Sequence, residues 1–185
     1  MKKFLIFTGI AVVVMIILGG LTMYYMRKQT KAFSPEDHLH FSQNDLEIKV
    51  FYNRPTKKGR EIFGGLVPYN KVWRTGANEA TTFETNRDLI FNGKKLSAGK
   101  YSLWTIPGET IWKVIFNSEY GQWGIRYDGE ANRTPANDVL TIDARSVKQE
   151  REFEEFTISF EKIGEEAEMV LIWDKTLVSV PFSHL

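Results

Sequence analysis

The stretch Asp88–Leu96, with the sequence DLIFNGKKL, gives the clearest indication of the fold class. Its dipeptide Asn92-Gly93 follows an apolar run and precedes Leu96 by two residues. Asparagine and glycine both tolerate a positive φ, so this pair favours a tight two-residue turn between antiparallel strands. The stretch therefore predicts a β-hairpin.

Short segments of alternating apolar and polar residues lie on both sides of this hairpin. In Glu47–Asn53, for example, the apolar residues share one face of an extended chain, as in a half-buried strand. Further strands are predicted at Ala80–Asn86, Tyr101–Ile106, Ile111–Asn117, Asp138–Val147, Phe153–Ile163, Met169–Trp173 and Thr176–Phe182. Residues 119–137, rich in Gly, Asn and Asp, are expected to form a long loop. No segment predicts an amphipathic helix, so we expect an all-β, antiparallel two-sheet sandwich, jelly-roll-like, over residues 45–185.

A run without charged residues, Phe4–Met26, precedes this region. As a helix it is long enough to cross a hydrocarbon core of roughly 30 Å. A cleaved signal peptide is the alternative, but its apolar region is typically about 7–15 residues and ends at a small-x-small site, which is missing here. We therefore expect a transmembrane anchor at residues 1–28 and a polar linker at residues 29–44. Basic residues on both sides of the run leave its orientation open.

Composition excludes several classes of function. Lysine and arginine number 24 against 23 acidic residues, so no nucleic-acid partner is predicted. The chain has no cysteine, which excludes disulfides, thiolate metal sites and cysteine nucleophiles. His38 and His40 lie beside Asp37, but no third ligand is evident, so no metal site is predicted. No nucleotide-binding glycine pattern, G-x-S-x-G or H-E-x-x-H motif occurs, and no cofactor is expected.

The segment Gly59–Thr82, GREIFGGLVPYNKVWRTGANEATT, is the strongest candidate for a functional loop. Its glycines and proline argue against a helix, and we expect the flanking strands to hold it in place. The candidate ligand-binding residues, from this segment and its surroundings, are Arg54, Arg60, Trp73, Arg74, Asn78, Glu79 and Trp123.

Each candidate has a functional and a structural interpretation. Arginines gathered by loops match a carboxylate or phosphate, and an exposed tryptophan provides a stacking platform for a sugar. Alternatively, the arginines pair with nearby acids, Trp73 belongs to the core, and Asn78 and Glu79 bond their own turn. The structural interpretation is favoured for Arg60 and Trp73, and the question is open for Arg74.

Catalysis, if there is any, would use Glu79 as acid or base. A glycosidase needs two carboxylates about 5–10 Å apart. Glu84 is five residues away, and an odd separation within one strand places two side chains on opposite faces. Glu79 and Glu84 are therefore not expected to act together unless a bulge intervenes.

Several motifs resemble those of an uncharacterised bacterial envelope family of the domain-of-unknown-function type. They include KGREIFGGLVPY at Lys58–Tyr69 and VWRTGANEAT at Val72–Thr81, with GKYSL at Gly99–Leu103 and WKVIFN at Trp112–Asn117. The resemblance covers residues 46–182. It implies an exported domain, so that the helix lies in the inner membrane and the domain in the periplasm. It implies no reaction.

We therefore expect a non-catalytic accessory or binding module. Its partners would be the membrane, reached through the single anchor helix, and either a membrane-protein complex or a glycan. A tether raises the local concentration of the domain near such partners, so that weak contacts suffice. The alternative is a hydrolase or lyase that acts on envelope carbohydrate through Glu79.

Overall fold

A computed structural model of the chain describes residues 2–164 and 166–184. The chain divides into two compact units, one that ends at Phe33 and one that starts at Ser34. The first unit is the helix α1, Lys2–Phe33. Residues 6–33 of α1 are long and apolar enough to cross a membrane, as a membrane span or a signal sequence would be. The predicted apolar helix is confirmed. It continues past residue 28 because the next helix-breaking proline is Pro35.

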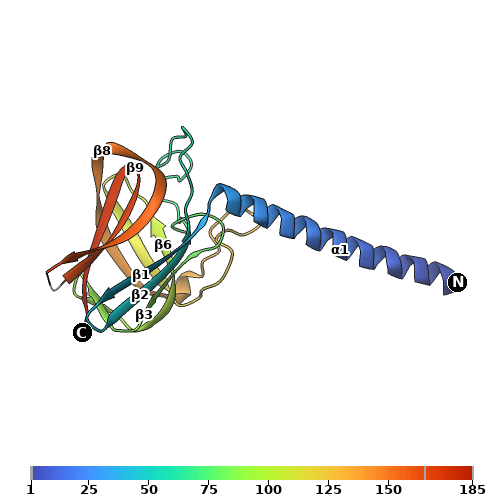
Figure 1. Ribbon diagram of the computed structural model, residues 1–185, viewed down its shortest axis with the longest axis horizontal. Helices are drawn as coiled ribbons and strands as arrows, with labels where there is room; N and C mark the ends of the chain where they lie inside the picture. Colours follow the sequence, from blue (N-terminus) through green and yellow to red (C-terminus); the bar gives the residue numbers. More distant parts are fainter. Residues whose placement is uncertain (1, 165, 185) are drawn as a thin grey trace. The chain divides into compact units, whose positions relative to one another are not determined.

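The second unit begins with a strand where a linker was expected. Strand β1, Glu36–Gln43, pairs antiparallel with β2, Leu46–Asn53 (Figure 1). The linker predicted for residues 29–44 is therefore wrong. In β1 only Phe41 and Gln43 are fully buried, whereas His38 and His40 face solvent. The apolar side of β1 is too short for composition alone to distinguish it from a polar spacer.

The strands form one antiparallel sheet. The remaining strands are β3 (Thr81–Thr85), β4 (Leu89–Phe91), β5 (Lys94–Leu96), β6 (Gly99–Ile106), β7 (Ile111–Asn117), β8 (Asp138–Ile163) and β9 (Glu166–His184). Their order in the sheet is β1-β2-β3-β6-β7-β8-β9-β4-β5, so the sheet is open, with β1 and β5 at its edges. This confirms the predicted all-β antiparallel class and is consistent with a sandwich.

The predicted hairpin forms as expected. Its strands are β4 and β5, and Asn92 and Gly93 have φ values of 48° and 74° between them. Positive φ at both central residues is the requirement of a type I′ turn.

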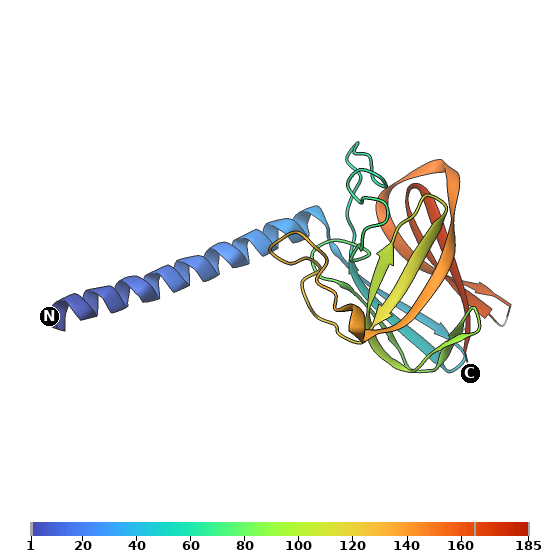
Figure 2. The same cartoon turned by 180° about the vertical axis from the view of Figure 1, so that it is seen from behind.

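Two strands are much longer than the sequence predicts. The predicted pairs of strands at residues 138–163 and 169–182 are merged into β8 and β9. The pairing register between β8 and β9 shifts between Lys148 and Phe153 and again between Phe153 and Thr157. These irregularities interrupt the alternation of apolar residues, which is why the sequence indicates two segments. Figure 2 shows how strongly β8, in orange, bends along its length.

The bend of the sheet produces a single main core. Phe41 of β1 stacks on Phe160 of β8 with 5.1 Å between ring centroids, and Gln43 donates a hydrogen bond to the Gly164 carbonyl. The far part of β8 thus covers the inner face of β1 and β2. Trp112 is 2% exposed and belongs to this core.

Candidate functional site

The turn that follows Trp73 is held in an unusual backbone conformation. Thr75 and Asn78 have φ values of 54° and 57°, a region that residues other than glycine seldom occupy. The Thr75 hydroxyl lies 3.1 Å from that of Thr105, and the Thr81 hydroxyl donates to the Thr75 carbonyl at 2.7 Å. These buried contacts to β6 and β3 fix the turn, as expected for a loop held by the flanking strands.

Asn78 and Glu79 take part in a polar network with Asn53 at the end of β2. The Asn78 amide donates to Asn53 Oδ1 at 3.3 Å, and the Asn53 amide donates to Glu79 Oε2 at 3.0 Å. Asn53 and Asn78 are both buried, whereas Glu79 is half-buried. The amide of Asn78 thus serves the fold, and only Glu79 remains within reach of a ligand.

Trp73 packs against the core. Its ring stacks on Trp173 at 6.0 Å and meets Phe156 edge-to-face at 4.9 Å between centroids. Its indole N–H donates to the Gly76 carbonyl at 2.9 Å. Both the ring and the polar atom are therefore occupied by the protein, in line with the structural interpretation of this residue.

Arg54 and Arg60 differ from Arg74, because both side chains form ion pairs or hydrogen bonds with other residues of the chain. Arg54 approaches Glu155 at 3.2 Å and Asp37 at 3.6 Å, and so links β2 to β8 and β1. Arg60 donates to the carbonyls of Thr56 and Lys57 in its own turn. The expected cluster of ligand-binding arginines is thus reduced to Arg74, whose Nε is buried without a hydrogen-bond partner.

A tyrosine next to Arg54 completes this junction. The Tyr52 hydroxyl donates to Asp37 Oδ2 at 3.1 Å and accepts from the Ile158 N–H at 3.2 Å. Burial, with the nearby Asp37 carboxylate, raises the pKa of Tyr52 to about 12. The phenol therefore stays neutral and connects β1, β2 and β8.

Trp123 lies in the loop between β7 and β8, which is attached to the turn. The Gly124 N–H donates to the Asn78 carbonyl at 3.0 Å, and the Ala80 N–H donates to the Gln122 carbonyl at 3.1 Å. Trp123 itself is half-buried and forms a backbone bridge with Glu79. The loop and the turn thus form one structural element.

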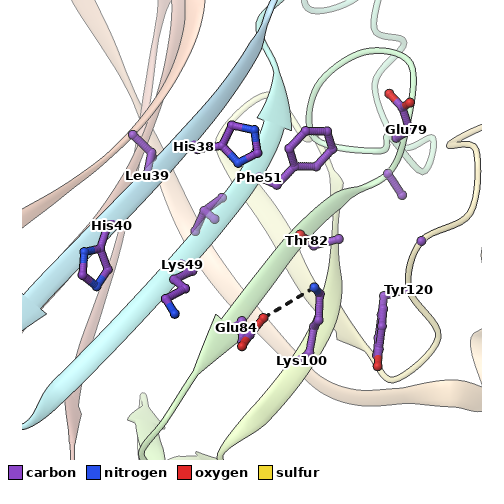
Figure 3. Close-up of a pocket in the computed structure, with 13 residues that line it drawn as sticks. His38, Leu39, His40, Lys49, Phe51, Glu79, Thr82, Glu84, Lys100 and Tyr120 are labelled. Carbon is purple, nitrogen blue, oxygen red and sulfur yellow. Dashed lines mark ion pairs between the residues drawn. The ribbon is translucent and has the colours of Figure 1, made fainter.

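An open cavity of about 690 Å³ lies on the outer face of β1, β2, β3 and β6, where the loop begins (Figure 3). Its volume is within the range of small-molecule sites. Its floor carries polar and aromatic side chains from the four strands, and Glu79, Tyr120 and Gly121 lie at its border. We call this cavity the outer groove. Among the described residues, no group of three or more His, Cys, Asp or Glu side chains is arranged to hold a metal.

A row of charged and titratable side chains crosses the floor of the outer groove. Strand register places His40 opposite Lys49, Lys49 opposite Glu84, and Glu84 opposite Lys100. Lys100 Nζ is 3.5 Å from Glu84 Oε2 and 5.4 Å from the ring centre of Tyr120. The row therefore offers hydrogen-bond donors and acceptors in alternation, next to an exposed aromatic ring.

Glu79 and Glu84 both line the outer groove, which corrects the expectation that they point to opposite faces. Strand β3 begins only at Thr81, so Glu79 lies outside the strand. The alternation of side chains between the two faces of a strand therefore does not apply to it. Figure 3 shows, however, that the two carboxylates are not directed at each other. Glu84 is paired with Lys100, and Glu79 accepts the bond from Asn53.

The groove residues other than Glu79 are absent from the candidates that the sequence provides. The missed residues with polar or aromatic side chains are His38, His40, Lys49, Phe51, Thr82, Glu84, Lys100 and Tyr120. Recognition of β1 as a strand would place His38 and His40 on one face, but their neighbours across the sheet depend on register. The pairing register between strands that are distant in the sequence cannot be derived from either strand alone.

The chain belongs to the family described as "Protein of unknown function (DUF2911)", whose model matches residues 34–182. The match therefore covers nearly all of the second unit and none of α1. No curated protein and no solved structure matches the chain. The envelope setting and the signature motif expected from the sequence remain predictions.

Proposed function

We propose that this chain is a membrane-tethered, non-catalytic binding domain that holds a segment of envelope glycan in the outer groove. The observation that carries the proposal is the open groove of about 690 Å³ on the outer face of a rigid four-strand floor. Sites built on strands hold their side chains more firmly than sites built on loops.

The chemistry of the groove suits a ligand rich in hydroxyl groups. Lysine donates hydrogen bonds, glutamate accepts them, and histidine and threonine do both, so the row and Thr82 complement sugar hydroxyls. Tyr120 is 51% exposed at the border and provides an aromatic surface for a sugar ring. Phe51 on the floor adds a second apolar surface, and its ring centroid lies 5.1 Å from that of His38.

The proposed location is the outer face of the inner membrane, with the domain in the periplasm. Two features support it: the apolar helix α1 directly precedes the domain, and the sequence resembles an exported family. A tether of this kind keeps the groove at a high local concentration near envelope polymers.

Tyr120→Ala in the full-length protein, held in mild detergent, tests the proposal. Binding of N-acetylglucosamine oligomers, measured by calorimetry, is expected to weaken by up to about tenfold, since aromatic stacking on one ring contributes about 0.5–1.5 kcal/mol. Tyr127→Ala is the matched control, because Tyr127 belongs to the same loop, is fully exposed and does not line the groove. Equal affinity of the two variants, or no binding by the unaltered protein, would refute this function.

A hydrolase or lyase is the second candidate, since Glu79 and Glu84 share the groove. It is less well supported, because Glu84 is engaged with Lys100 and the two carboxylates point apart. Incubation of the unaltered protein and Glu79→Gln with the same oligomers, followed by mass spectrometry, separates the two functions. Chain cleavage by the unaltered protein alone would establish the enzyme. Association with a membrane-protein complex stays a prediction, and purification of the full-length protein in mild detergent tests it.

A further inference from the structure

Three arginines of the second unit are only partly exposed: Arg54, Arg74 and Arg133. Arg54 forms ion pairs with two acidic residues, and Arg133 forms one with Asp138. No side-chain hydrogen bond or ion pair joins the Arg74 guanidinium to any residue that the structure describes. Arg74 is thus a shielded positive charge without the counter-charge that the other two possess.

The surroundings of Arg74 confirm its isolation. Nε is buried without a partner, and burial is the sole cause that lowers the pKa of Arg74 from its usual value. A neighbouring carboxylate would act in the opposite direction. The structure therefore keeps a charge in a place where nothing from the described chain compensates for it.

The Arg74 side chain is also fixed in position. A Cβ atom built on Gly124 would lie 2.0 Å from Arg74 Cδ and 2.7 Å from its Cβ, so the arginine stem is pressed against the loop backbone. The loop is in turn attached to the turn by the bond from the Gly124 N–H to the Asn78 carbonyl. The loop therefore restrains the stem of Arg74.

We propose that Arg74 is an oxyanion-binding residue, whose guanidinium pairs with a carboxylate or phosphate group of a ligand. A charge that is partly shielded from water is stabilised by pairing, and the planar guanidinium fork matches both groups in a bidentate manner. Because the side chain is already held in place, little conformational freedom is lost when the anion binds. This site is independent of the outer groove and does not require its ligand to be a glycan.

Thermal unfolding of the full-length protein in mild detergent tests the inference. Sodium phosphate and sodium glucuronate are each compared with sodium chloride at equal ionic strength. A ligand that binds only the folded state raises the Tm, so both oxyanions, or the better matched of the two, are expected to raise it above the chloride value. Because phosphate also stabilises folded proteins without binding a site, the ligand is identified by the part of each shift that is lost in Arg74→Gln: a larger loss with phosphate indicates a phosphate ligand, and a larger loss with glucuronate indicates a carboxylate.

Arg74→Gln is expected to weaken the apparent oxyanion affinity at least tenfold. Arg74→Lys should retain part of it, because lysine keeps the charge but not the fork. Arg145→Gln is the matched control, since Arg145 is an exposed arginine on β8 and its loss should leave the response unchanged. An equal response in Arg74→Gln, or no difference from chloride in the unaltered protein, would overturn the inference.

A second measurement covers the case in which Arg74→Gln does not fold. In the unaltered protein labelled with ¹⁵N-arginine, the Arg74 Nε–H resonance, assigned by its loss in Arg74→Lys, is followed during a phosphate titration. A saturable shift of this resonance supports the site. If the resonance does not shift at oxyanion concentrations up to 100 times the Kd fitted from thermal unfolding, the inference is overturned.

Discussion

The two faces of β1, β2, β3 and β6 are built from neighbouring residues yet have opposite characters. The inner row, one register line across the four strands, consists of Leu39, Val50, Phe83 and Tyr101. The outer row is displaced from it by one residue in each strand and consists of His40, Lys49, Glu84 and Lys100. The inner row packs in or against the core, although Leu39 and Val50 also border the groove, and the outer row lines the groove floor. The comparison teaches that the same strands divide stability and recognition between their faces.

The sharpest test of this division removes a fully buried aromatic ring from the inner row. Phe83 is fully buried, and Phe83→Ala is expected to lower the free energy of unfolding by about 3–5 kcal/mol because it leaves a cavity. Thr82→Ala, on the adjacent outer position, should change it by less than ~0.5 kcal/mol. Urea unfolding of the full-length protein, followed by tryptophan fluorescence, measures both, since all five tryptophans lie in the second unit. Similar losses in the two variants would contradict the division.

The ionisation of Tyr52 should have an effect of intermediate size on the free energy of unfolding, and this effect depends on pH. Its pKa is about 12 in the folded protein and about 10 when unfolded, so between these pH values the unfolded chain ionises while the folded one stays neutral. The free energy of unfolding should therefore fall as pH rises from 10 to 12, by up to about 1.4 kcal/mol per pH unit. The unfolding midpoint in urea, measured across this range, records the loss.

Tyr52→Phe is the control for that prediction. Without an ionisable hydroxyl at this position, the variant should show a distinctly shallower fall above pH 10. It also loses the bonds to Asp37 and Ile158, so a lower stability at neutral pH is expected. An unchanged slope in Tyr52→Phe would show that another group causes the pH dependence.

The smallest effect on stability is expected in the outer row. Lys100→Gln removes the pair with Glu84, and exposed ion pairs contribute little, so the free energy of unfolding should change by less than ~0.5 kcal/mol. Affinity for the glycan oligomers should nevertheless fall, because the donor at the groove floor is altered. Lys113→Gln, at an exposed ion pair with Asp143 on β7 and β8, should leave affinity unchanged. A stability loss comparable to that of Phe83→Ala would break the comparison.

Much of the fold follows from local patterns in the sequence. The Asn92-Gly93 turn and the alternation in β2 depend on residues that are close in the chain. Strand β1 escapes notice because its polar face and its short apolar face resemble a spacer. The continuity of β8 escapes notice because register shifts near Phe153 disrupt the pattern that alternation predicts.

The candidate site is less accessible to such reasoning. The sequence indicates a loop at Gly59–Thr82 held by the flanking strands, and its glycine and asparagine residues suit the positive φ angles found there. It cannot tell that Arg54 reaches acids on β1 and β8, that Arg60 bonds its own turn and that Arg74 is left unpaired. Those differences arise from contacts between segments up to about a hundred residues apart.

Strand β1 is the terminal strand of an open sheet, and its position there has one further consequence. A bare strand edge invites pairing with a second molecule. The side chains of Glu36, Asp37, His38 and His40 along this border make such pairing unfavourable, as charged residues do on other sheet borders. The border that frames the groove thus also disfavours edge-to-edge pairing between copies of the chain.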